Sequence, residues 1–324
     1  MEEFIMKRDL KKIISQMTLE EKAGMCSGLD FWHLKSVERL GIPEVMVSDG
    51  PHGLRKQDDK GDHLGMNDSI KAVCFPPAAL SACSFDRELM ESMGETIGRE
   101  AQANDVSVVL GPAVNIKRSP LCGRNFEYYS EDPLIAGTMA AAMTLGVQKV
   151  PGCGTTIKHF ACNNQEDNRM GSDSILSERA LREIYLKGFE IAVKDAQPMS
   201  IMTSYNLING VHAANCYDTC TKAARDEWGF AGAIMTDWTT TNVQIQGECT
   251  AAGCMRAGND MVMPGLPEDH ENIKKELADG TLTMAELKRC IYNTVNIVLQ
   301  SNMYEGAVSY LDQFDDLDTY LVVK

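Results

Sequence analysis

Short apolar runs recur along the chain, and each run ends in polar, glycine or proline residues before a stretch with helical spacing begins. The runs are nearly continuous in apolar residues rather than alternating. This predicts strands that are buried on both faces, as in a parallel sheet covered by helices. The predicted strands lie at residues 45–47, 106–110, 155–157, 199–203, 233–235 and 261–263.

Helix-start signals stand between and around these runs. The sequences TLEE at residues 18–21 and TMAE at residues 283–286 are capping boxes, in which the first and fourth side chains each satisfy a backbone N–H group of the first turn. Ser177 is predicted to cap a helix that reaches about residue 194, and Asp218 a helix that reaches residue 228.

The alternation of strands and helices over roughly 300 residues predicts an α/β fold. We expect a (β/α)8 TIM-type barrel, regular or irregular, that forms a single domain over residues 1–304. A doubly wound sheet is the alternative, but there is no GxGxxG motif after the first strand and no GxxxxGK[ST] motif in the chain. Residues 305–324 are predicted to be a C-terminal tail, either a short docking helix or an edge segment.

Composition narrows the range of partners. The 324 residues carry a net charge of −15, and 44% of them are hydrophobic, which is typical of a globular protein with a full core. Such an acidic surface argues against nucleic acid and anionic membranes as partners, and no apolar run is long enough to span a bilayer. A neutral substrate fits this charge.

The cysteines and the N-terminus favour a reducing, cytoplasmic location. The chain has eleven cysteines without a CxxC pair, and its N-terminus has no apolar signal region. Cys216 and Cys220 lack the further ligands of a zinc site, so most thiols are expected to be small buried apolar groups. We expect no metal and no cofactor.

Polar residues follow the predicted strands, always at the same end. In a parallel barrel the carboxyl ends of the strands converge on one mouth, where side chains are available for chemistry. Each residue alone has an ordinary explanation; Asp49 could start a turn, and Arg124 could pair with Glu127. Together they supply fixed donors, acceptors and aromatic faces, which is the combination that a hydroxyl-rich ligand requires. These residues are Asp49, Arg55, Arg124, Lys158, His159, Tyr205, Asp237 and Trp238.

Residues 232–238 (GAIMTDW) combine a carboxylate and an indole at the end of one apolar run. A carboxylate can attack the anomeric carbon of a sugar, and an aromatic ring can stack on the C–H face of a pyranose. A strand end or a helix N-cap would explain the same pattern, so this motif indicates a sugar site only together with the polar residues at the other strand ends.

The chain resembles the family 3 glycoside hydrolases, the β-glucosidase family, in ordered segments from about residue 10 to residue 300. The matching segments are VSDGPHGLR (47–55), LGPAVNI (110–116), GRNFEY (123–128), SEDP (130–133), KHF (158–160), NNQE (163–166), LREIYL (181–186), MTSYN (202–206), WGF (228–230) and TDW (236–238).

The resemblance implies a barrel, often irregular in this family, and a retaining mechanism. It implies Asp237 as the nucleophile, and Tyr205 as a group that orients the carboxylate of Asp237. The groups that hold the hydroxyls of the −1 sugar are then Asp49, Arg55, Arg124, Lys158 and His159, and the lining residues are Met202, Tyr205 and Trp238.

The general acid/base is the part of the family pattern that this sequence does not supply. Family β-glucosidases usually continue into an α/β-sandwich domain that provides a glutamate, whereas residues 310–324 match no part of the family. Members that act on N-acetylglucosaminides use a histidine in a barrel loop, but the corresponding loop, about residues 162–174, contains none. Of its acids, Glu166 is expected to have a structural or substrate-side role.

We therefore expect a retaining glycoside hydrolase that acts on terminal non-reducing β-D-glucosyl or related β-glycosyl residues. One alternative is a catalytically weak or silent sugar-binding barrel, or one subunit of a two-part enzyme. Another is a barrel that uses Lys158 as a Schiff-base lysine, with Arg124 lowering its pKa. A barrel without its partner domain should expose an apolar patch, which favours homo-oligomers.

Overall fold

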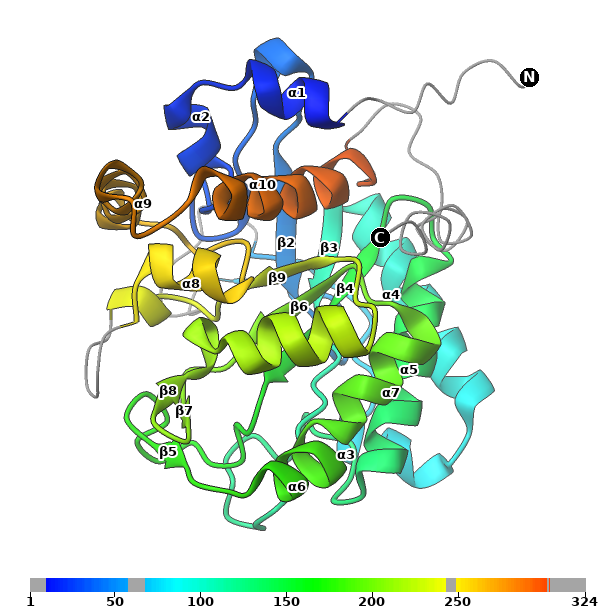
Figure 1. Cartoon of the computed structure of the whole chain (residues 1–324). Coiled ribbons are helices and arrows are strands. Elements are labelled where there is room, and N and C mark those ends of the chain that lie inside the picture. Colours follow the sequence, from blue (N-terminus) through cyan, green and yellow to red (C-terminus); the bar gives the residue numbers. More distant parts are fainter. Residues whose placement is uncertain (1–9, 58–67, 243–248, 302, 304–324) are drawn as a thin grey trace.

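The computed structural model describes residues 10–57, 68–242, 249–301 and 303, and a parallel sheet lies at its centre (Figure 1). Four strand pairs in the sheet are parallel, and only the first strand, β1, runs antiparallel to its neighbour. The strands, in their spatial order, are β1 (His33–Leu34), β2 (Val45–Asp49), β3 (Val106–Leu110), β4 (Gly154–Phe160), β6 (Ser200–Thr203) and β9 (Ala233–Met235).

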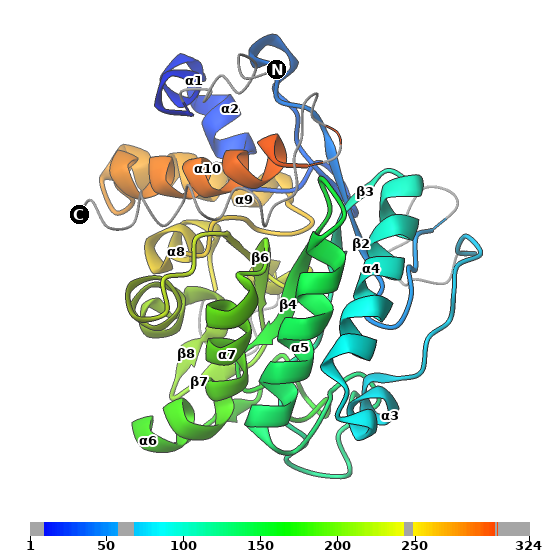
Figure 2. The same cartoon turned by 90° about the vertical axis from the view of Figure 1, so that its right-hand side faces the viewer.

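Helices cover the outside of this sheet. Helices α4 (Arg87–Ala103), α5 (Pro133–Gln148) and α7 (Lys187–Ala196) pack side by side over one part of the sheet (Figure 2). Small residues allow this close packing, because a Cβ atom at Gly146 of α5 would lie 2.0 Å from the main-chain oxygen of Glu91 in α4. Further helices are α1 (Leu10–Gln16), α2 (Leu19–Gly24), α3 (Ala78–Ser81), α8 (Ala251–Ala257), α9 (Pro267–Asp279) and α10 (Met284–Leu299), and short segments include η1 (Glu38–Leu40), η2 (Ala82–Ser84), η4 (Ala213–Asn215) and η6 (Thr240–Asn242).

Isolated β-bridges close the sheet into a ring. The bridging pairs are Met235 with Met261, Ser27 with Val262, and Gly28 with Leu34 of β1. We call these bridges the closing seam. A polar cluster lies on it, because Lys35 Nζ is 3.0 Å from Ser27 Oγ and 2.6 Å from His270 Nε2.

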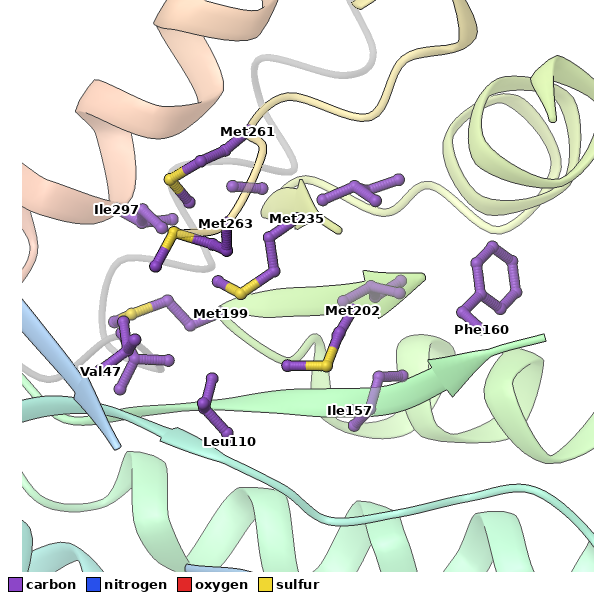
Figure 3. Close-up of a cluster of buried hydrophobic side chains, with 14 of the residues drawn as sticks. Val47, Leu110, Ile157, Phe160, Met199, Met202, Met235, Met261, Met263 and Ile297 are labelled. Carbon is purple, nitrogen blue, oxygen red and sulfur yellow. The ribbon is translucent and has the colours of Figure 1, made fainter. Parts of the chain in front are cut away.

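Methionine side chains fill the inside of the ring, which is therefore a packed core and not a channel. Met199, Met202, Met235, Met261 and Met263 meet there (Figure 3), and all five are buried. Aliphatic side chains from β2, β3 and β4 pack against them, namely Val47, Leu110 and Ile157.

The α/β class and most of the predicted strands are confirmed. The strand order follows the chain order without the reversal that marks a doubly wound sheet, so that alternative is wrong. Residues 261–263 contribute bridges instead of the predicted strand, and β1 is antiparallel, so the described part departs from a regular (β/α)8 repeat. The sequence pattern also missed a small second sheet of β5 (Asp173–Ser174), β7 (Leu207–Ile208) and β8 (Val211–His212).

The helix-start predictions met different outcomes. Both capping boxes, at Thr18 and Thr283, are confirmed. Ser177 caps a helix as predicted, but that helix is α6 (Glu178–Ala180), which continues as a π-helical segment, η3 (Leu181–Tyr185), before α7. The predicted cap at Asp218 is wrong, because this residue begins the π-helical segment η5 (Asp218–Glu227) and its carboxylate pairs with Lys222.

The tail predicted at residues 305–324 lies outside the described residues. Nine of the eleven cysteines are buried, as expected of small apolar groups; Cys74 and Cys83 are exposed. Among the described residues, none of the helices combines the length and the apolar character that crossing a bilayer requires.

Candidate active site

Asp237 is a buried aspartate that lies two residues after the end of the last strand of the sheet, β9. The backbone N–H of Trp238 donates to its Oδ1 atom at 2.7 Å, and Nε2 of His159 lies 3.8 Å from its Oδ2 atom. Burial raises the pKa of the Asp237 carboxyl, while the charges of Arg124 and Lys158 and the Trp238 N–H group oppose this shift. The structure thus holds a desolvated carboxylate beside fixed positive charges.

Lys158 and Asp49 meet across strands β4 and β2. The Nζ atom of Lys158 lies 3.2 Å from Oδ1 of Asp49, and its side chain is only 5% exposed. Arg55 reaches the other oxygen of Asp49 at 3.7 Å, with its own side chain 51% exposed. The carboxylate of Asp49 therefore orients two cations, one buried and one open to a ligand.

Arg124 forms an ion pair with the buried Glu127, the pairing that the sequence indicates as the ordinary role of this arginine. Its side chain also acts on the nucleophile candidate, because its charge opposes the rise in the pKa of Asp237. Burial lowers the pKa of Arg124, but the charges of Glu127, Tyr128 and Asp237 outweigh burial and raise it overall. Arg124 can thus pair with Glu127 and still act on Asp237 through its charge.

Tyr205 and Trp238 support the segment that carries Asp237. The hydroxyl of Tyr205 donates to the main-chain oxygen of Trp238 at 2.8 Å. Burial and the charge of Asp237 raise the pKa of Tyr205, so it remains a donor. The indole of Trp238 donates to the main-chain oxygen of Phe31 at 2.8 Å, and the rings of Phe31 and Trp32 lie 6.1 and 5.8 Å from it. Met202, predicted as a lining residue, is buried in the methionine core (Figure 3).

Arg169 belongs to the same site and was missed from sequence. Its guanidinium lies 4.7 Å from the ring centre of Tyr205, and its charge acts on both His159 and Asp237. Glu166 holds Arg169 through an ion pair of 2.9 Å and also accepts from Asn163 at 2.9 Å. These contacts agree with the structural role expected of Glu166.

His159 is buried between Tyr128 and Asp237. Burial, together with the charges of Arg124, Lys158 and Arg169, lowers its pKa well below the ordinary value of 6.5. The imidazole is therefore neutral in the folded protein near neutral pH.

This shift predicts a pH effect on stability. As the pH falls below 6.5, the unfolded chain binds a proton at His159 that the folded chain does not bind. The free energy of unfolding therefore has its full contribution from His159 above pH 6.5. That contribution is lost as the pH falls from 6.5 toward the lower pKa of the folded protein. We expect wild type to lose up to about 1.4 kcal/mol per pH unit more than His159→Gln in urea unfolding between pH 6.5 and 5. Asp237 and Asp260, whose pKa values burial raises, act in the opposite direction but are common to both proteins. Parallel curves for the two proteins would contradict the prediction.

The chain is similar to one family model and to several known proteins over most of its length. The family model described as "Glycosyl hydrolase family 3 N terminal domain" matches residues 15–296. "Thermostable beta-glucosidase B" of Acetivibrio thermocellus is 48% identical over 296 residues, which make up 90% of this chain and 38% of that protein. "Exo-alpha-(1->6)-L-arabinopyranosidase" of Bifidobacterium longum is 44% identical over 95% of this chain and 39% of its own length.

A solved structure, beta-glucosidase 3B from Thermotoga neapolitana in complex with glucose, superposes with a TM-score of 0.83 at 37% identity. The match covers 95% of this chain and 45% of that one. The chain therefore spans about two-fifths of the length of the relatives that it matches.

Proposed function

The chain belongs to glycosyl hydrolase family 3, and we propose that it is the nucleophile-bearing barrel of a retaining glycoside hydrolase of β-glucosidase type. Its substrates are terminal non-reducing β-D-glucosyl or related β-glycosyl residues. The observation that carries this proposal is the buried carboxylate of Asp237, which lies two residues after the end of β9 and faces His159, with the charges of Arg124 and Lys158 acting on it. We also infer an irregular TIM-type barrel that extends to about residue 304.

In the first step a carboxylate oxygen of Asp237 bonds to the anomeric carbon while the bond to the aglycone oxygen breaks, and the leaving group takes the electron pair and a proton from the acid/base. Water then attacks the anomeric carbon, gives one proton back to the acid/base and releases Asp237 as a carboxylate, which completes a double displacement with retention. Asp49, Arg55, Arg124, Lys158, His159 and Arg169 supply the charged and polar groups that bind the sugar hydroxyls, and Trp238 supplies an aromatic face.

Asp49 favours this role for Lys158 over the Schiff-base alternative. A Schiff-base lysine attacks as a neutral amine, whereas the Nζ atom of Lys158 forms an ion pair with Asp49 at 3.2 Å. The pair fits a cation that binds a hydroxyl group.

We propose that the acid/base acts from a domain beyond the matched segment, as is usual in the family. Glu166, one of the acids in the loop at residues 162–174, is engaged by Arg169 and Asn163.

Glu166→Gln provides a test of this assignment. Without acid catalysis, substrates with poor leaving groups react more slowly by roughly 10²–10⁴-fold, whereas a dinitrophenolate leaves without a proton. We expect Glu166→Gln to leave the ratio of rates for dinitrophenyl and methyl β-glucosides as it is in wild type. A selective loss of methyl glucoside hydrolysis would identify Glu166 as the acid.

The proposed function is tested by intact-mass measurement after incubation with 2,4-dinitrophenyl 2-deoxy-2-fluoro-β-D-glucoside. We expect a gain of one fluoroglucosyl unit, because the fluorine slows the second step and the leaving group needs no proton. The corresponding α-L-arabinopyranoside serves as a competitor, since one relative carries that name. No adduct, together with stabilisation against heat by glucose, would show a sugar-binding barrel instead of an enzyme.

A further inference from the structure

Tyr128 is a fully buried tyrosine whose hydroxyl meets three nitrogen atoms beside the proposed sugar site. Its Oη atom lies 2.9 Å from Nδ2 of Asn163, 3.4 Å from Nδ2 of Asn115 and 3.2 Å from Nδ1 of His159. Strand β4 carries His159, and the segment after β3 carries Asn115, so the hydroxyl ties two other segments of the chain to the histidine that faces the proposed nucleophile.

The orientation of both asparagine amides is fixed by partners that can only accept. Nδ2 of Asn163 also donates to the carboxylate of Glu166 at 2.9 Å, and Nδ2 of Asn115 donates to the main-chain oxygen of His159 at 2.8 Å. A carboxylate and a carbonyl accept hydrogen bonds and donate none, so the atoms that face them are the NH₂ groups. Both amides therefore present N–H groups to the hydroxyl of Tyr128.

Counting the protons then fixes the direction of the bond to His159. A tyrosine hydroxyl has one proton, and its oxygen accepts here from the two amides, so the proton is directed to Nδ1 of His159. Burial raises the pKa of Tyr128 and lowers that of His159, so the hydroxyl keeps its proton and the imidazole stays neutral. A neutral imidazole that accepts at Nδ1 carries its proton on Nε2.

We propose that Tyr128 is a positioning residue that holds His159 as the Nε2–H tautomer, so that His159 offers a donor to Asp237 and to a sugar hydroxyl beside it. Nε2 faces Oδ2 of Asp237 at 3.8 Å. The other tautomer would turn a lone pair toward the carboxylate, which is repulsive and leaves a sugar oxygen without its donor. The assignment of this effect to catalysis rests on the proposed function.

The first test reads the tautomer of the wild-type protein directly. With ¹⁵N-labelled histidine, long-range ¹H–¹⁵N spectra between pH 6.5 and 8.5 should show a protonated, pyrrole-type Nε2 and a pyridine-type Nδ1 for His159. His159→Gln identifies the signals. A protonated Nδ1 would overturn the proposal, and this readout does not depend on glycosidase activity.

The second test replaces Tyr128 with phenylalanine, which removes only the hydroxyl. We expect the rate constant of fluoroglucosyl labelling to fall roughly 10- to 100-fold, as for the loss of a buried hydrogen bond to a polar group, and the Nε2–H signal to be lost or mixed. Tyr129→Phe is the matched control, because Tyr129 is the next residue and is also buried. It should retain both the labelling rate and the tautomer.

Equal labelling rates for the two variants, or an unchanged tautomer in Tyr128→Phe, would overturn the proposal. If Tyr128→Phe does not fold, the spectrum of wild type decides. A wild-type protein that is not labelled at all contradicts the proposed function, while the tautomer remains readable.

Discussion

Replacing Asp237 with asparagine is expected to abolish formation of the fluoroglucosyl adduct, with a loss of more than about 10⁴-fold in the labelling rate. The amide has nearly the same shape but is far less nucleophilic than a carboxylate. Its oxygen can still accept from the N–H group of Trp238, so the local structure is retained. The measurement is intact mass over time at a saturating concentration of the dinitrophenyl fluoroglucoside.

Asp237→Asn should keep the thermal stability of wild type or exceed it slightly. The site desolvates the carboxylate, as the raised pKa of Asp237 shows, and a neutral amide avoids that cost. Asp226→Asn, an exposed position on η5, is the matched control and should be labelled as wild type is. Labelling of Asp237→Asn at the wild-type rate would remove Asp237 from the nucleophile role.

The largest loss of stability is expected at Asp260, a fully buried aspartate that joins three elements away from the proposed nucleophile. It pairs with Arg225 of η5, accepts from the N–H group of Ile234 in β9 at 2.7 Å, and accepts from Asn293 of α10 at 2.9 Å. The side chain of Arg225 is 13% exposed, so removing the carboxylate leaves a buried charge without its partner. We expect Asp260→Ala to lower the free energy of unfolding by about 3–5 kcal/mol in urea titration.

Two further variants test whether the loss of stability comes from the unpaired buried charge. Arg179→Met removes a cation from a pair with Glu183 in which both side chains are exposed, and it should cost at most about 1 kcal/mol. The double variant Arg225→Met/Asp260→Leu should regain much of the loss of Asp260→Ala, because apolar side chains avoid the unpaired charge. A double variant that is less stable than Asp260→Ala would show that the loss comes from packing and not from charge.

The sequence was most informative where a strand delivers a residue directly. Asp237 and Trp238 follow β9 after one intervening residue, and β4 itself carries Lys158 and His159. In both cases an apolar run fixes the strand and, with it, the place of the polar residues near its end. The parallel arrangement then brings these ends together, which is why their proximity could be predicted without any knowledge of the loops.

Residues that loops carry were harder to predict. Arg169 reaches the site because its loop folds back over the ring of Tyr205, and no local pattern specifies that path. The rings of Phe31 and Trp32, which lie beside Trp238, come from the N-terminal part of the chain, next to β1. Strand β1 has only two residues, which are too few to give a periodic signal. The π-helical turns in η3 and η5 likewise leave the apolar spacing close to that of an α-helix, so sequence predicted continuous helices.

The closing seam has a consequence for synthesis on the ribosome. Residues 26–28 are made early, but their partner across the seam, Val262, is made late. Until that part of the chain emerges, the nascent chain has one open sheet edge at β9 and an unpaired segment at its N-terminal side, and unpaired edges invite association with other chains. The methionine core also stays open on that side. The sheet is therefore completed late in synthesis, and before that point the nascent chain is most exposed to association with other chains.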